Sequence, residues 1–223
     1  MTTPQTVTIA IDGAEPVSGL WQPPPKARAC LVLAHGAGAG MAHKSMAAIA
    51  DGLAERGVAT LRYQFPYMER GSKRPDRPPV AHAAVRAAVA EARQLAPKLP
   101  LFAGGRSFGG RMTSQAQALA PLGGVRGLVF FAFPLHPAGK PSEERATHLS
   151  AVALPMLFLQ GTRDELAQLD LLRLAVAKLG ARTTLMLVAE ADHTFRVPAK
   201  MGRKDADVLA EILDEAASWM MAR

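Results

Sequence analysis

The sequence predicts an α/β fold, in which a mostly parallel sheet of about eight strands is flanked by helices on both faces. Short apolar runs recur along the chain, and helical patterns separate most of them. Most of these runs are continuously apolar rather than alternating, as expected for parallel strands buried on both faces. With 223 residues, 49% of them hydrophobic, the chain is long enough for one sizeable core. We expect a single domain over residues 1–223.

The first two strands are expected to form an antiparallel pair. Val7–Ile11 (VTIAI) and Val17–Gln22 (VSGLWQ) alternate in polarity, and Asp12-Gly13 lies between them. A DG dipeptide between alternating runs is typical of a β-hairpin. The stiff connector Pro23–Pro25 follows.

The remaining strands and helices then alternate along the chain. The expected strands are ACLVLAH (29–35), GVATLRYQF (57–65), LFAGG (101–105), GLVFFAF (127–133), MLFLQG (156–161) and TTLMLVAEA (183–191). The expected helices span residues 45–56, 80–95, 108–119, 167–179 and 205–221. The last has apolar residues at helical spacing, which we interpret as core packing. Repeated strand–helix–strand units favour right-handed crossovers and a parallel sheet.

Two segments have an irregular pattern. One is the Pro- and Arg-rich stretch Glu69–Pro79, and the other runs from Pro134 to about Ala146. Neither is long enough for a large helical domain over the sheet. If they line the mouth of a site, their basic residues would give it a positive field; the alternative is that these are solvated loop charges.

Composition narrows the classes of function. The formal net charge is +7, yet the basic residues are spread out and no nucleic-acid-binding signature is present, so no nucleic-acid partner is expected. No apolar run is long enough for a membrane span, and MTTPQTVTIA does not resemble a signal peptide. We therefore expect a cytoplasmic protein. The single cysteine, Cys30, excludes an intrachain disulfide and a cysteine metal cluster, and no metal or cofactor is expected.

Chemically useful residues follow several of the expected strands. Ligands of open α/β sheets bind at the carboxyl ends of the strands. A Gly-rich loop beginning at His35 follows the first buried run, Ser107 the third, Asp164 the fifth and His193 the last. These ends meet at one edge of the sheet, so a hydroxyl, a carboxylate and an imidazole are expected to lie together.

Ser107 is the candidate nucleophile. Gly105-Arg106-Ser107-Phe108-Gly109 matches G-x-S-x-G, and it lies where a buried strand meets a helix. Such a turn holds the serine in a strained conformation, and small residues two before and two after it let strand and helix approach closely. The alternative is a serine that only caps the helix beginning at Phe108.

A serine hydroxyl needs a base, and the base needs an acid to orient it. His193 is the one histidine after the last expected strand, and Asp164 ends the strand before it. Asp192 and Glu165 are rival acids, but the side chain of Asp192 diverges from that of its neighbour His193. The order Ser107, Asp164, His193 is the nucleophile–acid–base order of one large hydrolase superfamily.

The developing oxyanion needs two N–H donors. In such a turn one comes from the residue after the nucleophile, Phe108, and the other from the Gly-rich loop, which favours Ala37. The rival interpretation of HGAGAG is a phosphate-binding loop. It lacks the Gly-Lys-Ser/Thr ending of a P-loop and fits G-x-G-x-x-G poorly.

Together these residues resemble the α/β-hydrolase superfamily over nearly the whole chain. More narrowly, HGAGAGM, FPYMERG–RPDRPP, GGRSFGGRM, PLHPAGKP, QGTRDE and ADHTF resemble a small, cap-poor group of serine hydrolases of unassigned substrate. That group is similar to a domain in a subunit of a eukaryotic chromatin acetyltransferase complex. One departure is His43 in MAHKSM, where the group has an acidic or small residue.

The resemblance implies an α/β-hydrolase fold with a minimal cap and a Ser107–His193–Asp164 triad, with an oxyanion hole at Ala37 and Phe108. The candidate residues for the substrate rim are His43, Arg106, His136 and Lys140. Dienelactone hydrolases share the fold but use a cysteine nucleophile, and Cys30 lies at the wrong end of its strand.

The expected function is hydrolysis of a small-molecule carboxylic ester or thioester by a carboxylesterase-like serine hydrolase. Two alternatives remain open on the sequence: a non-enzymatic interaction module on a hydrolase fold, and an acyltransferase or perhydrolase that uses the same triad.

Overall fold

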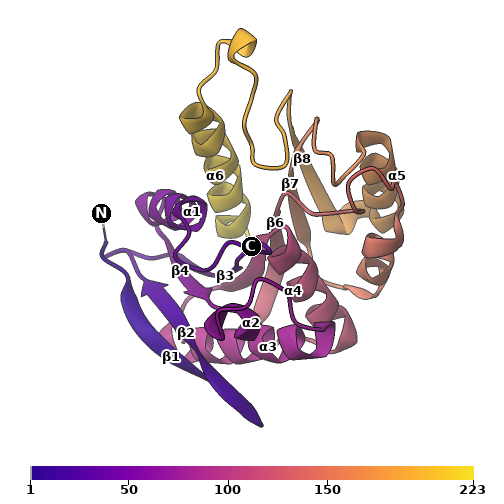
Figure 1. Cartoon of the computed structure of the whole chain (residues 1–223). Coiled ribbons are helices and arrows are strands. Elements are labelled where there is room, and N and C mark those ends of the chain that lie inside the picture. Colours follow the sequence, from indigo (N-terminus) through magenta and orange to yellow (C-terminus); the bar gives the residue numbers. More distant parts are fainter. Residues whose placement is uncertain (1) are drawn as a thin grey trace.

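The computed structural model describes residues 2–223 and has one eight-stranded sheet at its centre (Figure 1). Its spatial order is β1-β2-β4-β3-β5-β6-β7-β8. The strands are β1 (Gln5–Ile11), β2 (Ala14–Gln22), β3 (Ala29–Ala34), β4 (Val58–Tyr63), β5 (Leu101–Arg106), β6 (Val125–Phe131), β7 (Met156–Gly161) and β8 (Thr183–Val188). The expected fold class is confirmed: every pairing from β4 to β8 is parallel, and helices cover both faces.

Six α-helices and three 3₁₀ segments accompany the sheet. The helices are α1 (Lys44–Glu55), α2 (Pro66–Glu69), α3 (Pro78–Leu95), α4 (Phe108–Leu119), α5 (Leu169–Leu179) and α6 (Asp205–Met221). The 3₁₀ segments are η1 (Glu144–Ala151), η2 (Gly180–Arg182) and η3 (Ala199–Met201). Helices α1 and α6 lie side by side on one face of the sheet, and α3, α4 and α5 cover the other face (Figure 1). The central strands are apolar on both faces because each face packs against helices.

The N-terminal strands form the expected hairpin. β1 and β2 pair antiparallel across the Asp12-Gly13 turn, where Gly13 takes a φ of 70°. β2 then pairs antiparallel with β4. The hairpin therefore extends one edge of the otherwise parallel sheet.

Two short helical elements lie in or beside segments that the sequence leaves irregular. Pro66 is the first residue of α2, where its fixed φ suits the helix and its missing N–H costs nothing. Asp76 closes the following loop: its carboxylate accepts a hydrogen bond from the Tyr67 N–H (2.7 Å) and pairs with Arg70 (2.6 Å). The 3₁₀ segment η1 follows the loop after β6 and packs against α4. Single turns are too short to leave a periodic pattern in the sequence.

The strand order decides which loops meet. β5 lies between β3 and β6, and β7 and β8 follow outward toward one edge. Because these five strands are parallel, the segments after β3, β5, β7 and β8 all leave from the same end of the sheet. Within residues 2–223, no helix combines the length and apolar character that a membrane crossing requires.

Candidate active site

The turn between β5 and α4 holds Ser107 in a strained backbone conformation. Its φ is 50° and its ψ is −117°, a region that residues with a side chain rarely enter. Glycines make the turn feasible. A Cβ at Gly105 would lie 2.4 Å from the carbonyl oxygen of Ala34, and a Cβ at Gly109 would lie 2.6 Å from the same oxygen. The turn therefore packs directly against the end of β3, and only glycine fits at these two positions.

The hydroxyl of Ser107 has no structural role at the start of α4. Ser107 is the N-cap residue of α4, but its side chain makes no capping hydrogen bond. Its backbone N–H instead donates to the Phe131 carbonyl (3.0 Å), which fixes the turn to the end of β6. The Oγ atom lies 2.8 Å from Nε2 of His193. The capping alternative therefore does not describe this serine.

His193 is held between Ser107 and Asp164. Its Nδ1 lies 2.7 Å from Oδ2 of Asp164, and its side chain is 21% exposed, while that of Asp164 is fully buried. With the proton on Nδ1, the ring donates to Asp164 and its Nε2 accepts the hydroxyl proton of Ser107. A buried carboxylate needs further donors. The backbone N–H of Leu166 (2.8 Å) and Nε2 of Gln160 (2.5 Å) supply them.

The two rival acids have other positions. Asp192 closes the turn after β8: its Oδ1 accepts hydrogen bonds from the hydroxyl and N–H of Thr194 and from the N–H of Arg196. Burial acts to raise the pKa of Asp192, but these hydrogen bonds outweigh it and the pKa is lowered. Glu165 lines a cavity next to His193 without a hydrogen bond to the ring. Within residues 2–223, the carboxylate that contacts His193 is that of Asp164.

The Gly-rich loop after β3 comes close to Ser107. A Cβ on Gly36 would lie 3.7 Å from Cβ of Ser107. The next residue, Ala37, is exposed, and its N–H has no hydrogen-bond acceptor among the described residues. The N–H of Phe108 begins α4, where the first N–H groups of a helix have no intrahelical partner. Two N–H donors are thus available beside the nucleophile.

Buried side chains hold this loop in place. His35 is fully buried; its Nδ1 lies 2.8 Å from the Gly36 carbonyl, and its Nε2 accepts the N–H of Phe65 (3.1 Å). Burial lowers the pKa of His35 to about 4, so the ring is neutral and can make both contacts. Further along the loop, the Tyr67 hydroxyl accepts the N–H of Gly38 at 3.3 Å. The segments after β3 and β4 are therefore joined beneath the site.

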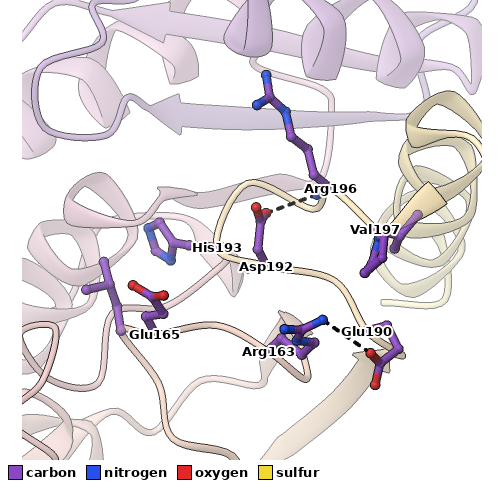
Figure 2. Close-up of a pocket in the computed structure, with 9 residues that line it drawn as sticks. Arg163, Glu165, Glu190, Asp192, His193, Arg196 and Val197 are labelled. Atoms are coloured by element: carbon purple, nitrogen blue, oxygen red, sulfur yellow. Dashed lines mark hydrogen bonds and ion pairs between the residues drawn. The ribbon is translucent and has the colours of Figure 1, made fainter. Parts of the chain in front are cut away.

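A cavity of about 610 Å³ lies beside His193 (Figure 2). Glu165 and Leu166 border it on one side, and Arg163 pairs with Glu190 across its floor at 3.5 Å. In Figure 2 the guanidinium of Arg196 extends away from the labelled side chains that surround His193. The site is open, and residues 2–223 form no large helical cap over this edge of the sheet.

The structure places the four candidate rim residues differently. His43 is exposed at the N-cap of α1, and Arg106 donates from Nη1 to Ser45 Oγ (2.9 Å) in the same region. Lys140 is exposed in the turn after β6. His136 is only 3% exposed, but it lines an open cavity of about 800 Å³ together with Asp164 and Glu165. Its Nε2 accepts the N–H of Gln168 (2.8 Å) and its Nδ1 lies 2.9 Å from the Pro137 carbonyl, because the ring ties two loops together.

Sequence reasoning missed Gln160. It is fully buried on β7, and its amide donates to the same carboxylate oxygen that contacts His193. The signal was one polar side chain at the end of the apolar run MLFLQG, four residues before Asp164.

Arg70 lies in the stretch Glu69–Pro79, whose basic residues would give the mouth of a site a positive field. In the structure its guanidinium is paired with the carboxylate of Asp76.

Metal-ligating residues do not cluster in this fold. Over residues 2–223, no group of three or more His, Cys, Asp or Glu side chains has the arrangement to hold a metal ion. Cys30 is buried in β3, and burial raises the pKa of its thiol to about 12.

Solved structures share this architecture. A dienelactone hydrolase from Anabaena variabilis superposes with a TM-score of 0.77 at 20% identity, covering 99% of this chain and 98% of that one. A lidless serine hydrolase from Xanthomonas campestris gives 0.74 at 21% identity, with 98% and 96% covered. A serine hydrolase homologue from Coxiella burnetii gives 0.73 at 18% identity, with 100% and 98% covered. At these identities the likeness establishes the fold alone.

The sequence itself also matches a known family. The model of a family described as "Alpha/beta hydrolase domain" matches residues 27–221, which leaves out the N-terminal hairpin and includes every strand end that contributes to the site. With the eight-stranded sheet and its flanking helices, this match shows that the chain belongs to the alpha/beta hydrolase family.

Proposed function

We propose that the protein is a serine hydrolase that cleaves small-molecule carboxylic esters or thioesters through an acyl-enzyme on Ser107. The observation that carries the proposal is the unbroken chain of contacts from Ser107 Oγ to His193 Nε2 (2.8 Å) and from His193 Nδ1 to Asp164 Oδ2 (2.7 Å). A scaffold has no physical need for a strained serine that makes no cap and faces a histidine.

In the first half of the reaction, His193 Nε2 takes the hydroxyl proton while Ser107 Oγ attacks the carbonyl carbon of the substrate. The electron pair of the carbonyl moves to its oxygen. The N–H groups of Ala37 and Phe108 are the donors available to stabilise that oxyanion.

The tetrahedral intermediate then collapses. The bond to the leaving alkoxide or thiolate breaks, the proton on His193 passes to the leaving group, and the acyl group stays on Ser107. A water molecule next gives its proton to His193 and its oxygen to the acyl carbon. A second collapse releases the carboxylic acid and returns the proton to Ser107 Oγ.

Asp164 keeps the histidine in the required tautomer throughout. Its side chain is fully buried, so its charge acts on His193 with little screening by water. The donors Gln160 and Leu166 hold the carboxylate in one orientation. Because the cavity beside His193 is open, small substrates that reach the site from solvent fit it best.

Fluorophosphonate labelling tests the proposal. The probe reacts with activated serines, and intact mass counts the adducts on wild type, Ser107→Ala and His193→Ala. We expect one adduct on wild type and none on either variant, with circular dichroism showing that all three are folded.

An unlabelled but folded wild type would overturn the proposal, and the interaction-module alternative would then take its place. Labelling that persists in Ser107→Ala would also overturn it, because the activated serine would lie elsewhere. If labelling behaves as expected, product ratios with water, alcohol and peroxide as acyl acceptors separate hydrolysis from acyl transfer and perhydrolysis.

A further inference from the structure

A second, smaller cavity lies on the α1 and α6 side of the candidate triad. It measures about 250 Å³ and is formed by the start of α1, the loop after β8 and the first turns of α6. Arg106 and Thr194 line it, and they are the sequence neighbours of Ser107 and His193. The cavity therefore adjoins the nucleophile and the base through their own backbone neighbours.

Three cationic side chains line this cavity. Lys44, Arg106 and Arg196 line it together with one carboxylate, Asp205. Over residues 2–223, none of these three cations has a carboxylate within ion-pair distance. Asp205 accepts the Val197 N–H at 3.4 Å, in the first turn of α6. The cavity lining thus holds three cations and one carboxylate, and Asp192 and Asp164 offset this positive charge only from outside ion-pair distance.

One hydrogen bond orients the Arg106 guanidinium and leaves most of its N–H donors available. Its Nη1 donates to Ser45 Oγ at 2.9 Å, and Ser45 Oγ in turn lies 2.8 Å from Nδ1 of His43. A guanidinium has five N–H donors, so four remain without a protein acceptor. Burial lowers the pKa of Arg106, partly opposed by Asp192 and Asp164. A partly dehydrated guanidinium with free donors is suited to a bidentate anion.

Arg196 reaches the cavity from the other side. Its backbone N–H donates to Asp192, while its side chain makes no hydrogen bond or ion pair among the described residues. Arg196 lines both cavities, and its guanidinium points away from the other labelled side chains of the His193 cavity (Figure 2). Asp192 attracts the guanidinium of Arg196 at longer range but forms no ion pair with it, and its Oδ1 accepts three hydrogen bonds from the turn.

Part of the cavity lining is apolar. The apolar residues are Ala48, Ile49, Phe195, Leu209 and Ile212. Since a water molecule occupies about 30 Å³ in the liquid, the cavity holds about eight non-hydrogen atoms of that size. This combination fits a short alkyl chain that ends in an anion, and it disfavours both a bare ion and a long neutral chain.

We propose that this cavity is a specificity subsite, in which Arg106 and Arg196 bind a carboxylate carried a few carbons from the scissile ester or thioester bond. The proposal rests on the proposed function of the adjacent Ser107. It narrows the substrate class to half-esters and half-thioesters of short dicarboxylic acids.

Matched substrates test the subsite. Mono-p-nitrophenyl adipate carries the terminal carboxylate, and p-nitrophenyl hexanoate has the same chain length without it. We expect wild type to have at least a tenfold higher kcat/KM for the adipate, as one or two charge-assisted hydrogen bonds allow. Arg196→Gln and Arg106→Gln are each expected to lower that ratio about tenfold.

Arg173→Gln is the matched control. Arg173 is exposed on α5, so this variant removes the same charge elsewhere on the surface and should keep the wild-type ratio. Arg196 is exposed, so its variant is expected to fold even if the Arg106 variant does not. Equal kcat/KM for the two esters in wild type would overturn the subsite and leave the proposed function standing. An unchanged ratio in a folded Arg196→Gln would also overturn it.

A binding measurement keeps the two proposals separable. A calorimetric titration of Ser107→Ala with monomethyl adipate measures the affinity of the subsite in a variant that cannot turn the ester over. We expect saturable binding that weakens about tenfold when Arg196→Gln is added. Binding without activity in wild type would support the subsite and contradict the proposed hydrolysis, while no binding would overturn the subsite.

Discussion

The backbone of Ser107 stores strain at the point where the proposed chemistry occurs. A φ of 50° with a ψ of −117° costs a residue with a side chain about 1–3 kcal/mol, whereas glycine adopts it freely. Hydrogen bonds at both ends of the peptide hold the conformation: the N–H to Phe131 and the carbonyl to the N–H of Arg111. The hydroxyl is thereby aimed at His193 by the fold and not by its own preference.

Replacing this serine separates strain from chemistry. We expect Ser107→Gly to unfold with a free energy about 1 kcal/mol higher than that of Ser107→Ala, since glycine relieves the strain but loses entropy on folding. Both variants should lack activity. Urea unfolding of the two proteins gives the difference. An alanine variant as stable as the glycine variant would show that the turn is not strained.

Gln160 contacts the candidate acid Asp164 and not Ser107 or His193, so we expect it to act by positioning that carboxylate. Its Nε2 donates to Asp164, while its buried Oε1 has no hydrogen-bond partner among the described residues. A flipped amide would bring two oxygens together, so the carboxylate fixes its orientation. The residue therefore tolerates one unsatisfied oxygen in order to hold Asp164.

Gln160→Leu is expected to lower kcat about tenfold with KM little changed, because Asp164 loses a charge-assisted hydrogen bond worth about 1.5–3 kcal/mol. The melting temperature should stay near that of wild type, since leucine also removes the unsatisfied oxygen. Steady-state kinetics on a p-nitrophenyl ester gives kcat and KM, and a thermal unfolding curve gives the melting temperature. An unchanged kcat would show that the Leu166 N–H alone positions the acid.

At the scale of elements, neutral histidines join segments that come from different strands. His35 links the loops after β3 and β4, where it also packs edge-on against Phe65 at 4.9 Å. His148 on η1 lies 2.8 Å from the Ser114 hydroxyl of α4. Burial, with Arg111 and His82 nearby, lowers the pKa of His148 to about 4. The His35 joint needs an unprotonated Nε2 to accept the Phe65 N–H, whereas His148 donates to Ser114 and is kept neutral by burial and by the nearby positive charge.

These joints predict a stability that falls with acid. An unfolded histidine titrates near pH 6.5, whereas His35 titrates near 4 in the fold, so the unfolded chain binds more protons between these values. The stability is complete above pH 6.5 and is lost as the pH falls toward 4. The loss is up to about 3 kcal/mol for His35 and less for His148, which solvent reaches.

Urea unfolding between pH 4 and 7.5 measures this dependence. His148→Gln keeps an N–H donor for the Ser114 hydroxyl but does not titrate, so its stability should fall less steeply than that of wild type over the same range. Parallel curves for the two proteins would show that His148 is not one of the groups responsible.

At the scale of the whole molecule, a net charge of +7 surrounds an open site. A positive field raises the encounter rate of anionic ligands, and salt screens it as the Debye length falls from about 30 Å at 0.01 M to about 3 Å at 1 M. We expect kcat/KM for mono-p-nitrophenyl adipate to fall several-fold over this range, while that for p-nitrophenyl hexanoate stays nearly constant. A parallel decline of both would indicate a general effect of salt on the enzyme.

Much of this architecture could be predicted because its signals are local. β7 and the helices α4 and α6 begin and end at the expected residues, since buried strands and amphipathic helices each have a characteristic pattern. Ser107, Asp164 and His193 could be grouped because strand ends of a parallel sheet share an edge. The structure brings their side chains within hydrogen-bond distance.

The remaining features depend on contacts between distant residues. Nothing local distinguishes His136, which is buried against Gln168, from a solvated loop histidine. The same holds for the chain of contacts from Arg106 through Ser45 to His43, because Arg106 and Ser45 are 61 positions apart in the sequence. Such partners become visible only once the sheet has brought the segments together.

Asp164 and His193 follow β7 and β8, the last two strands at one edge of the sheet. Ser107 follows β5, which lies near the middle. β8 is the outermost strand, and five of its six residues are only partly buried. Strands of this kind exchange their amide hydrogens through local opening, at a free energy below that of global unfolding. When β8 detaches, His193 leaves Ser107 although the core beneath α1 and α3 remains folded. On warming, we therefore expect the activity to be lost below the temperature of global unfolding. On cooling, the activity should return without refolding of the whole chain.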